Sequence, residues 1–208
     1  MHPVVVGIAG GTASGKSILA SELARQLGPR AQLLLHDRYY KPLPPEYRSN
    51  PVSYNFDAPV ALDTARFVRD LDVLRAGRGT SVPQYDFATH DRRVEEEWLE
   101  ARPLLIVEGI LVLADEALRQ RFDHALFVHT PEDLRLIRRV RRDTRERGRT
   151  TEEVLAQYER TVRPMHLLHV EPSRGHAELE LDGTVPVQRL VEQVLALPRV
   201  ALAVGAVA

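Results

Sequence analysis

Short hydrophobic runs alternate along the chain with segments in which apolar residues recur at helical spacing. Each run has the length of a buried strand and is bounded by polar residues, glycine or proline. The runs that we expect to hold core strands are VVVGIA (4–9), AQLLL (31–35), PLLIVEGILVL (103–113), HALFVHT (124–130) and AELEL (177–181). A further segment, TSVPQYDF (80–87), contains Pro83, which favours an extended or edge segment.

The segments between these runs predict helices. The helices that we expect cover 16–27, a stretch capped by Asp63 and Thr64 that ends near Arg75, a segment that starts at Thr130-Pro131-Glu132-Asp133, and 187–197. The first places leucine at 19, 23 and 27 and stops at a Gly-Pro pair, which ends helices. Strands that alternate with helices indicate an α/β fold whose parallel sheet is covered on both faces. In such sheets, ligands bind at the carboxyl ends of the strands.

Composition narrows the class of protein. The 208 residues are 44% hydrophobic with a formal net charge of −1, which fits one substantial domain and gives no sign of a polyanion binder. There is no cysteine, so disulfides and thiolate chemistry are excluded. The start of the chain has no basic segment of the signal-peptide kind, and the apolar tail (198–208) is shorter than the roughly 20 residues of a membrane span. We expect a cytoplasmic protein without a membrane or nucleic-acid partner.

The residues that follow the first run have the spacing G-x-x-x-x-G-K-S. They are Gly10, Gly11, Thr12, Ala13, Ser14, Gly15, Lys16 and Ser17. Glycines at this spacing let backbone N–H groups surround phosphate oxygens, and the helix that follows adds its dipole. Lys16 would reach the β- and γ-phosphates and Ser17 would hold Mg²⁺. The motif predicts ATP or GTP binding in a three-layer P-loop sandwich, and Lys16 is one of only two lysines in the chain.

Two carboxylates follow predicted strands. Asp37 comes just after the second strand, where it could accept a proton from an attacking hydroxyl, although such a residue can also be a simple turn aspartate. Glu108 ends the strand in LLIVEG and is a candidate for the Mg²⁺ shell, or else a loop carboxylate. Together they favour a kinase over a nucleotide switch, because a kinase needs a base and an acceptor pocket.

An arginine-rich segment follows the fourth run. Between residues 135 and 149 it holds arginine at 135, 138, 139, 141, 142, 145, 147 and 149, against only Asp143 and Glu146. A nucleic-acid face and a plain solvated helix are alternatives. A lid that closes over a triphosphate fits better, with Leu134, Ile137 and Val140 as its packed stripe and Gly148 at its bend.

Motifs along most of the chain resemble the uridine kinase (uridine–cytidine kinase) family. They are GIAGGTASGKS, HDRYYK, YNFDAPVALD, PQYDFATHDR, VEGILVL, LRLIRRVRRDTRERGRT, QYERTVRPMHLLHVEPS and AELEL, in that family's order from about residue 4 to 197. The phosphate loop alone is widely shared, whereas the combination of YDF and a nearby histidine with ERGR and VRPMH is far more specific. The resemblance implies transfer of the γ-phosphate of ATP or GTP to the 5′-hydroxyl of uridine or cytidine.

The same resemblance implies roles for individual residues. Asp37 matches the general base, which acts with Lys16, and Ser17, Glu108 and Asp37 match the Mg²⁺ neighbourhood. The residues that match nucleoside contacts are Tyr40, Asp57, Tyr85, Phe87, His90, Arg139, Arg149 and Gln157. Arg142 and Arg147 match arginines that meet phosphates. Histidine can donate or accept a hydrogen bond, which suits a site for both uracil and cytosine.

We therefore expect one P-loop kinase domain over 1–208, with a nucleoside-binding insertion at about 38–95 and a lid at about 135–163. A homo-oligomer, a tetramer by the family's pattern, is implied by the resemblance alone. Two other functions stay open. One is a related kinase of the phosphoribulokinase or pantothenate kinase type, and the other is a non-catalytic nucleotide-binding regulator.

Overall fold

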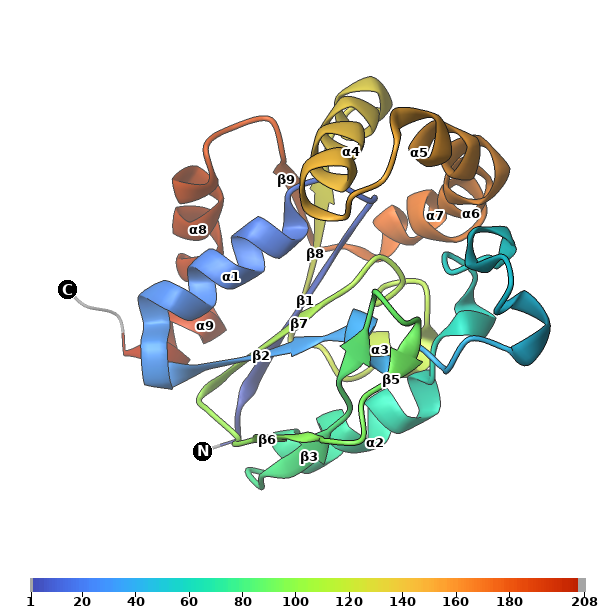
Figure 1. The fold of residues 1–208 in the computed structure, drawn as a ribbon. Helices are drawn as coiled ribbons and strands as arrows, with labels where there is room; N and C mark the ends of the chain where they lie inside the picture. The colour runs from blue at the N-terminus through green and yellow to red at the C-terminus, as the bar shows by residue number, and fades with distance from the viewer. Residues whose placement is uncertain (1, 206–208) are drawn as a thin grey trace.

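The computed structural model describes residues 2–205. Its centre is a parallel sheet with the strand order β2-β7-β1-β8-β9 (Figure 1). These strands are β1 (Val4–Gly10), β2 (Ala31–Leu35), β7 (Leu104–Glu108), β8 (His124–His129) and β9 (Leu179–Asp182). Each strand overlaps one of the hydrophobic runs, and every neighbouring pair is parallel. The predicted α/β fold with a parallel sheet is confirmed.

Helices lie on both sides of this sheet. They are α1 (Lys16–Leu27), α2 (Thr64–Arg75), α3 (Glu116–Arg119), α4 (Glu132–Glu146), α5 (Thr151–Gln157), α6 (Arg163–Met165), α7 (Glu171–Ser173), α8 (Val187–Leu195) and α9 (Pro198–Val204). Asp63 caps α2 as predicted, because its carboxylate accepts from the N–H of Arg66 over 3.1 Å. Within the described part of the chain, none of these helices has the length and apolar character that crossing a membrane requires.

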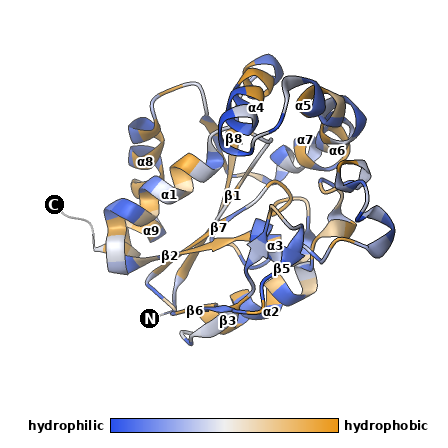
Figure 2. Cartoon of the chain, viewed as in Figure 1, coloured by the Kyte–Doolittle hydropathy of each residue, from blue (hydrophilic) through white to orange (hydrophobic). Residues whose placement is uncertain are grey.

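The sheet separates two hydrophobic cores. Val6 and Ile8 of β1 belong to the core that includes α1, α8 and α9, whereas Val5 and Ala9 belong to the core that includes α2. This division follows from the strand period of two residues, which sends successive side chains to opposite faces. Burial of each large aliphatic side chain contributes about 1.5–3 kcal/mol. The central strands are accordingly apolar, and the outer helices carry polar faces (Figure 2).

Two small two-stranded sheets lie outside the main sheet. β3 (Thr80–Val82) pairs antiparallel with β6 (Glu97–Leu99), and β4 (Tyr85–Asp86) pairs antiparallel with β5 (Asp91–Arg92). The predicted extended segment with Pro83 thus becomes two short strands separated by this proline. The turn between β4 and β5 carries His90 with a φ of 55°, a conformation that few residues other than glycine adopt.

The end of the chain differs from the predicted tail. Residues 198–204 form helix α9, in which Val200 and Val204 are buried against the core of α1. The guanidinium of Arg30 donates to the carbonyl of Val204 over 2.7 Å, which ties the helix to the turn after α1. Treating 198–208 as a plain tail was wrong for this helix, and residues 206–208 lie outside the described part.

Helix α4 also differs from expectation. Arg135, Arg139 and Asp143 are its buried residues, and Ile137 is 46% exposed. These three polar positions are four residues apart, so they share one face of the helix. The predicted stripe of Leu134, Ile137 and Val140 is therefore wrong. The helix packs through charged side chains that find polar partners inside the protein.

Candidate active site

The loop at residues 10–17 requires glycine at two points. Gly10 has a φ of 147° and Gly15 a φ of 104°, both in a region that side chains disfavour. A Cβ at Gly10 would lie 2.5 Å from the carbonyl oxygen of Val128, so the close approach of β1 to β8 also excludes a side chain there. Gly15 is the residue immediately before α1, which directs the helix N-terminus at the loop.

Neighbouring elements hold the loop from behind. The hydroxyl of Thr130 donates to the carbonyl of Ser14 over 2.9 Å, so this threonine fixes the loop instead of capping α4. The guanidinium of Arg135 lies against Gly11 and donates to the carbonyl of Thr130 over 3.0 Å. The loop is thus positioned by polar contacts from the end of β8 and the start of α4.

Strand register brings the two carboxylates to the same edge of the sheet as the loop. Glu108 pairs with Ile8 of β1 on one side and with Leu35 of β2 on the other. Gly10 follows Ile8 by two residues, and Asp37 follows Leu35 by two residues in a short 3₁₀ turn. Parallel strands end at a common edge, so the loop and both carboxylates meet there.

Glu108 lies at the centre of this edge and is only 5% exposed. Its Oε1 is 3.3 Å from the Nζ of Lys16 and accepts a hydrogen bond from the hydroxyl of Ser17 over 3.2 Å. Burial raises the pKa of the Glu108 carboxyl, the charge of Lys16 opposes that shift, and the charge of Asp37 adds to it. The charges of Lys16 and Asp37 therefore both act on the Glu108 carboxylate.

The donor set fits a magnesium ion bound mainly by phosphate and water. Among residues 2–205, no group of three or more histidine, aspartate or glutamate side chains could hold a metal ion by themselves. Mg²⁺ in phosphate-transfer sites needs only one or two protein oxygens, because the nucleotide and water supply the others. The Ser17 hydroxyl and Glu108 carboxylate, with Asp37 nearby, meet this requirement.

Asp57 lies close to the same edge although it comes from the insertion after β2. Burial raises the pKa of its carboxyl, and the charge of Asp37 raises it further. The charges of Arg139 and Lys16 oppose this shift. Tyr40 is also buried, and its phenol has a pKa raised by burial and by the charges of Asp37 and Asp57. The charges of Asp37, Arg139 and Lys16 therefore act on the Asp57 carboxyl, and those of Asp37 and Asp57 act on the Tyr40 phenol.

An aromatic cluster lies next to these charges. The ring of Tyr40 is 5.3 Å from that of Tyr85, which is 5.2 Å from that of Phe87. The ring of His90 stacks on Phe56, with centroids 4.9 Å apart. The sequence did not single out Phe56, and its position in the NFD segment, one residue before Asp57, was the signal available.

Two polar atoms of this cluster have no partner. The hydroxyl of Tyr85 and the Nδ1 of His90 are buried and form no hydrogen bond with any described residue. Buried polar atoms are normally bonded, so an unpaired pair in one aromatic cluster is typical of a ligand site. Burial and the charge of Arg149 lower the pKa of the His90 ring, which keeps it neutral near pH 7. Phe87, by contrast, is 49% exposed.

Helix α4 and the turn after it supply the basic side chains. Arg139 donates to the hydroxyl of Thr12 in the loop over 2.9 Å and to Oε1 of Gln157 over 2.9 Å. Arg149 donates to the same Gln157 oxygen over 2.6 Å. Arg139, Gln157 and Arg149 therefore form one connected group, and Arg139 joins it to the phosphate loop.

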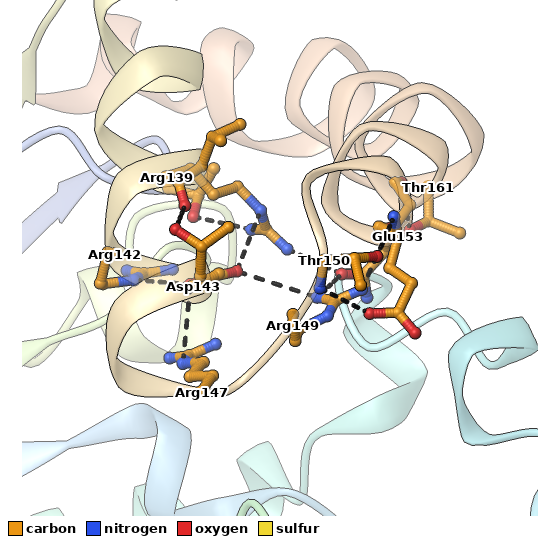
Figure 3. Close-up of polar contacts among 12 residues, drawn as sticks. Arg139, Arg142, Asp143, Arg147, Arg149, Thr150, Glu153 and Thr161 are labelled. Carbon is orange, nitrogen blue, oxygen red and sulfur yellow. Dashed lines mark hydrogen bonds and ion pairs between the residues drawn. The ribbon is translucent and has the colours of Figure 1, made fainter.

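In this structure, the two arginines predicted for phosphate both contact Asp143. Arg142 donates to Asp143, and Arg147 forms an ion pair with Asp143 (Figure 3). The guanidinium of Arg147 also lies over the Phe87 ring, with its central carbon 5.7 Å from the ring centroid. The sequence shows Asp143 as one of two acids among the arginines, and in the structure it forms ion pairs with Arg139, Arg142, Arg147 and Arg149. Its spacing of four from Arg139 and of eight from Arg135 was the signal that could have revealed it.

Comparisons with known proteins identify the family of this chain. The model of the phosphoribulokinase / uridine kinase family matches residues 5–190. Uridine kinase of Chloroflexus aurantiacus is 45% identical over 183 residues, which are 88% of this chain and 88% of that protein. Uridine kinase of Pectobacterium carotovorum is 39% identical over 181 residues, 85% of each chain.

Solved structures show the same fold at low identity. Phosphoribulokinase from Rhodobacter spheroides superposes with a TM-score of 0.62 and 14% identity, over 89% of this chain and 74% of that one. A possible uridine kinase from Bacillus stearothermophilus gives 0.56 and 18%, over 88% and 90%. The fold is therefore that of the P-loop kinases, and the family match covers nearly the whole chain. This chain belongs to the phosphoribulokinase / uridine kinase family.

Proposed function

We propose that this protein transfers the γ-phosphate of ATP or GTP to the 5′-hydroxyl of uridine or cytidine, giving UMP or CMP in pyrimidine salvage. The observation that carries the proposal is the position of Glu108, whose carboxylate contacts Lys16 of the phosphate loop and also feels the charge of Asp37. We infer that the phosphate-binding Lys16 and the candidate base Asp37 face one site. The relatives named uridine kinase support the choice of acceptor.

The proposed reaction needs few groups. Asp37 accepts the proton of the 5′-hydroxyl while the hydroxyl oxygen forms a bond to the γ-phosphorus. The bond between that phosphorus and the bridging oxygen breaks, and the nucleoside diphosphate leaves with the electron pair. Lys16 balances the charge on the transferred group, and the loop amides hold the remaining phosphates.

A magnesium ion would be held by Ser17 and Glu108, with Asp37 close by, and when bound it would neutralise negative charge on the phosphates. Lys16 and Ser17 are contacted by the same Glu108 oxygen. In the protein alone, that oxygen therefore keeps both side chains directed at Glu108. Its removal would free the Lys16 ammonium inside a buried site.

The acceptor would lie between the charged group and the aromatic cluster. Asp57 and Arg139 would hold the ribose hydroxyls, and Tyr40 would pack beside the sugar. The Tyr85 hydroxyl and the His90 Nδ1 would bond to the edge of the pyrimidine, because both are buried without a hydrogen-bond partner in residues 2–205. Phe87 would supply apolar contact to the base. Gln157 already accepts hydrogen bonds from Arg139 and Arg149. These three side chains would together line one side of the nucleoside site.

The arginines of α4 would form a lid over both substrates, with Arg142 and Arg147 on the phosphates. A closed lid balances charge during transfer and excludes water that would otherwise hydrolyse ATP. A homo-oligomeric state, a tetramer by the family's pattern, and a cytoplasmic location stay predictions.

A panel of acceptors tests this function. Purified protein with Mg²⁺ and ATP or GTP is offered uridine, cytidine, ribulose 5-phosphate or pantothenate, and the phosphorylated product is identified by mass spectrometry. We expect UMP and CMP only. Phosphorylation of ribulose 5-phosphate or pantothenate but not of uridine would favour a related kinase. ATP hydrolysis that is independent of every acceptor would favour a non-catalytic regulator.

A further inference from the structure

We propose that Asp143 is a positioning residue that couples the two substrates, because its two carboxylate oxygens hold different pairs of lid arginines. The proposal rests on the function proposed above and deepens it. It assigns a role to a side chain that is separate from the phosphate loop, the base and the aromatic cluster. It also predicts that the nucleotide and the nucleoside strengthen each other's binding.

The Asp143 side chain is completely buried and has arginines on several sides (Figure 3). Its Oδ1 lies 2.8 Å from the Nε of Arg142 and 3.7 Å from the Nε of Arg147. Its Oδ2 lies 3.6 Å from the Nε of Arg139 and 3.8 Å from NH1 of Arg149. An aspartate buried to this degree is stable as an anion only if such cations surround it.

Each carboxylate oxygen of Asp143 contacts the arginines that we propose for one of the two substrates. Oδ1 takes Arg142 and Arg147, the pair proposed for the phosphates, and Oδ2 takes Arg139 and Arg149, the pair proposed for the nucleoside. The backbone of Asp143 adds to this control, because its carbonyl accepts from the N–H groups of both Arg147 and Arg149. One residue thus sets the path of the turn and the direction of both pairs.

The contacts are incomplete in the protein alone. Only Arg142 donates a hydrogen bond to the carboxylate, and Oδ2 of Asp143 and Nε of Arg139 are buried without a hydrogen-bond partner among the described residues. Several guanidinium groups facing one carboxylate leave positive charge in excess. Phosphate oxygens would balance this excess and accept charge-assisted bonds from the same arginines.

Coupling follows from the sharing of one carboxylate. When a nucleotide orders Arg142 and Arg147, the Oδ1 side of Asp143 is fixed, and the position of Oδ2 is fixed with it. Arg139 already contacts Thr12 of the loop and Gln157 in the protein alone, so a fixed Asp143 completes its placement before the nucleoside arrives. The ordering cost that the nucleoside would otherwise meet is reduced, which appears as tighter binding.

Binding measurements on three proteins test this coupling. Isothermal titration gives the Kd of uridine without and with a saturating non-hydrolysable ATP analogue and Mg²⁺, for wild type, Asp143→Asn and Glu146→Gln. Glu146 is an exposed acid on the same helix and serves as the matched control. We expect the analogue to tighten uridine binding at least about fivefold in wild type and in Glu146→Gln, and to leave it nearly unchanged in Asp143→Asn.

A folded Asp143→Asn protein that keeps the wild-type ratio would overturn the proposal, even if both Kd values rise together. A wild-type ratio of one would also overturn it. If Asp143→Asn does not fold, Arg142→Gln leaves the carboxylate in place and should lower the ratio in the same way.

Failure of the proposed function is recognised separately. Wild type would then bind the analogue but not uridine. The Asp143 proposal would be judged by the Kd of the analogue alone, which should rise about tenfold in Asp143→Asn because Arg142 and Arg147 lose their anchor. An unchanged Kd of the analogue would contradict it.

Discussion

The Nζ of Lys16 lies 3.3 Å from Oε1 of Glu108, and the two side chains are only 10% and 6% exposed. A buried ion pair of this kind is costly unless good geometry and further hydrogen bonds offset the loss of hydration of both charges. Here the same oxygen also accepts from Ser17. We infer that Glu108 orients the lysine and the serine for the phosphates and Mg²⁺ before the nucleotide binds.

Replacing the Glu108 carboxylate should weaken the binding of Mg²⁺ in the active enzyme. In Glu108→Gln the amide keeps the shape but loses the charge that attracts Mg²⁺ and balances Lys16. We expect the Mg²⁺ concentration at half-maximal activity to rise about tenfold or more. Titration of activity with Mg²⁺ at saturating ATP and uridine measures it. Glu192→Gln, an exposed substitution on α8, should behave as wild type, and an unchanged Mg²⁺ dependence in Glu108→Gln would remove Glu108 from the metal site.

Replacing the candidate base should slow the chemical step without affecting nucleotide binding. Asp37→Asn removes the proton acceptor but leaves Lys16, Ser17 and Glu108 in place. We expect kcat to fall by about 10²-fold or more, with the Kd of an ATP analogue changed less than about threefold. Single-turnover kinetics and isothermal titration measure the two quantities. Asp133→Asn, exposed in the first turn of α4, is the control, and wild-type turnover in Asp37→Asn would exclude Asp37 as the base.

Replacing His90 should affect the nucleoside and spare the nucleotide. His90→Ala removes an unpaired buried nitrogen and the ring that stacks on Phe56. We expect the KM for uridine to rise about tenfold and the KM for ATP to stay near that of wild type. His176→Ala, at an exposed histidine, should change neither value. Equal increases in both KM values would show that His90 does not lie on the acceptor side.

The same histidine predicts a pH dependence. Burial and the charge of Arg149 lower its pKa, so the ring gains its proton at a lower pH than an ordinary histidine does. We expect the KM for uridine to be flat from about pH 7 to 8 and to rise toward acid pH as the charged ring loses its acceptor nitrogen. The rise should be absent in His90→Ala. A rise that begins above pH 7 in wild type would contradict the lowered pKa.

Helix α9 should contribute to stability through one face only. Val200 is completely buried, whereas Leu202 on the same helix is 79% exposed. Val200→Asp places an unpaired charge in the core and should lower the free energy of unfolding by about 3 kcal/mol or more. Leu202→Asp should change it by less than about 0.5 kcal/mol. Urea unfolding followed by circular dichroism compares them, and equal values would mean that α9 does not pack on the core.

Much of this architecture could be predicted because local patterns and tertiary packing agree. The apolar run before Gly10 predicts a strand, the spacing of glycines predicts the phosphate loop, and the spacing of leucines after Lys16 predicts a helix. The carboxyl-edge positions of Asp37 and Glu108 then followed from the parallel sheet alone. Helix α9 could also have been predicted, because Pro198 suits a first helical turn, and Val200 and Val204 are four residues apart.

The packed face of α4 was harder to predict. Hydrophobic periodicity assigned the packed face of α4 to Leu134, Ile137 and Val140, but this helix packs through Arg139 and Asp143. Charged residues are rarely buried unless partners surround them, and these partners come from distant segments, as Thr12 and Gln157 do. The pattern of hydrophobic and polar residues within the helix does not predict such partners. The spacing of Asp143 from Arg139 places both on one face of the helix, but only the fold shows the distant partners that allow this face to be buried.

The central claim is that a nucleoside and a nucleotide meet between Asp37 and Lys16. A crystal structure with uridine, a non-hydrolysable ATP analogue and Mg²⁺ tests it most directly. We predict the 5′-hydroxyl within hydrogen-bond distance of the Asp37 carboxylate and directed at the γ-phosphorus, with the pyrimidine against Phe87 and His90. A uridine bound away from the aromatic cluster, or a 5′-hydroxyl that points away from Asp37, would contradict the account.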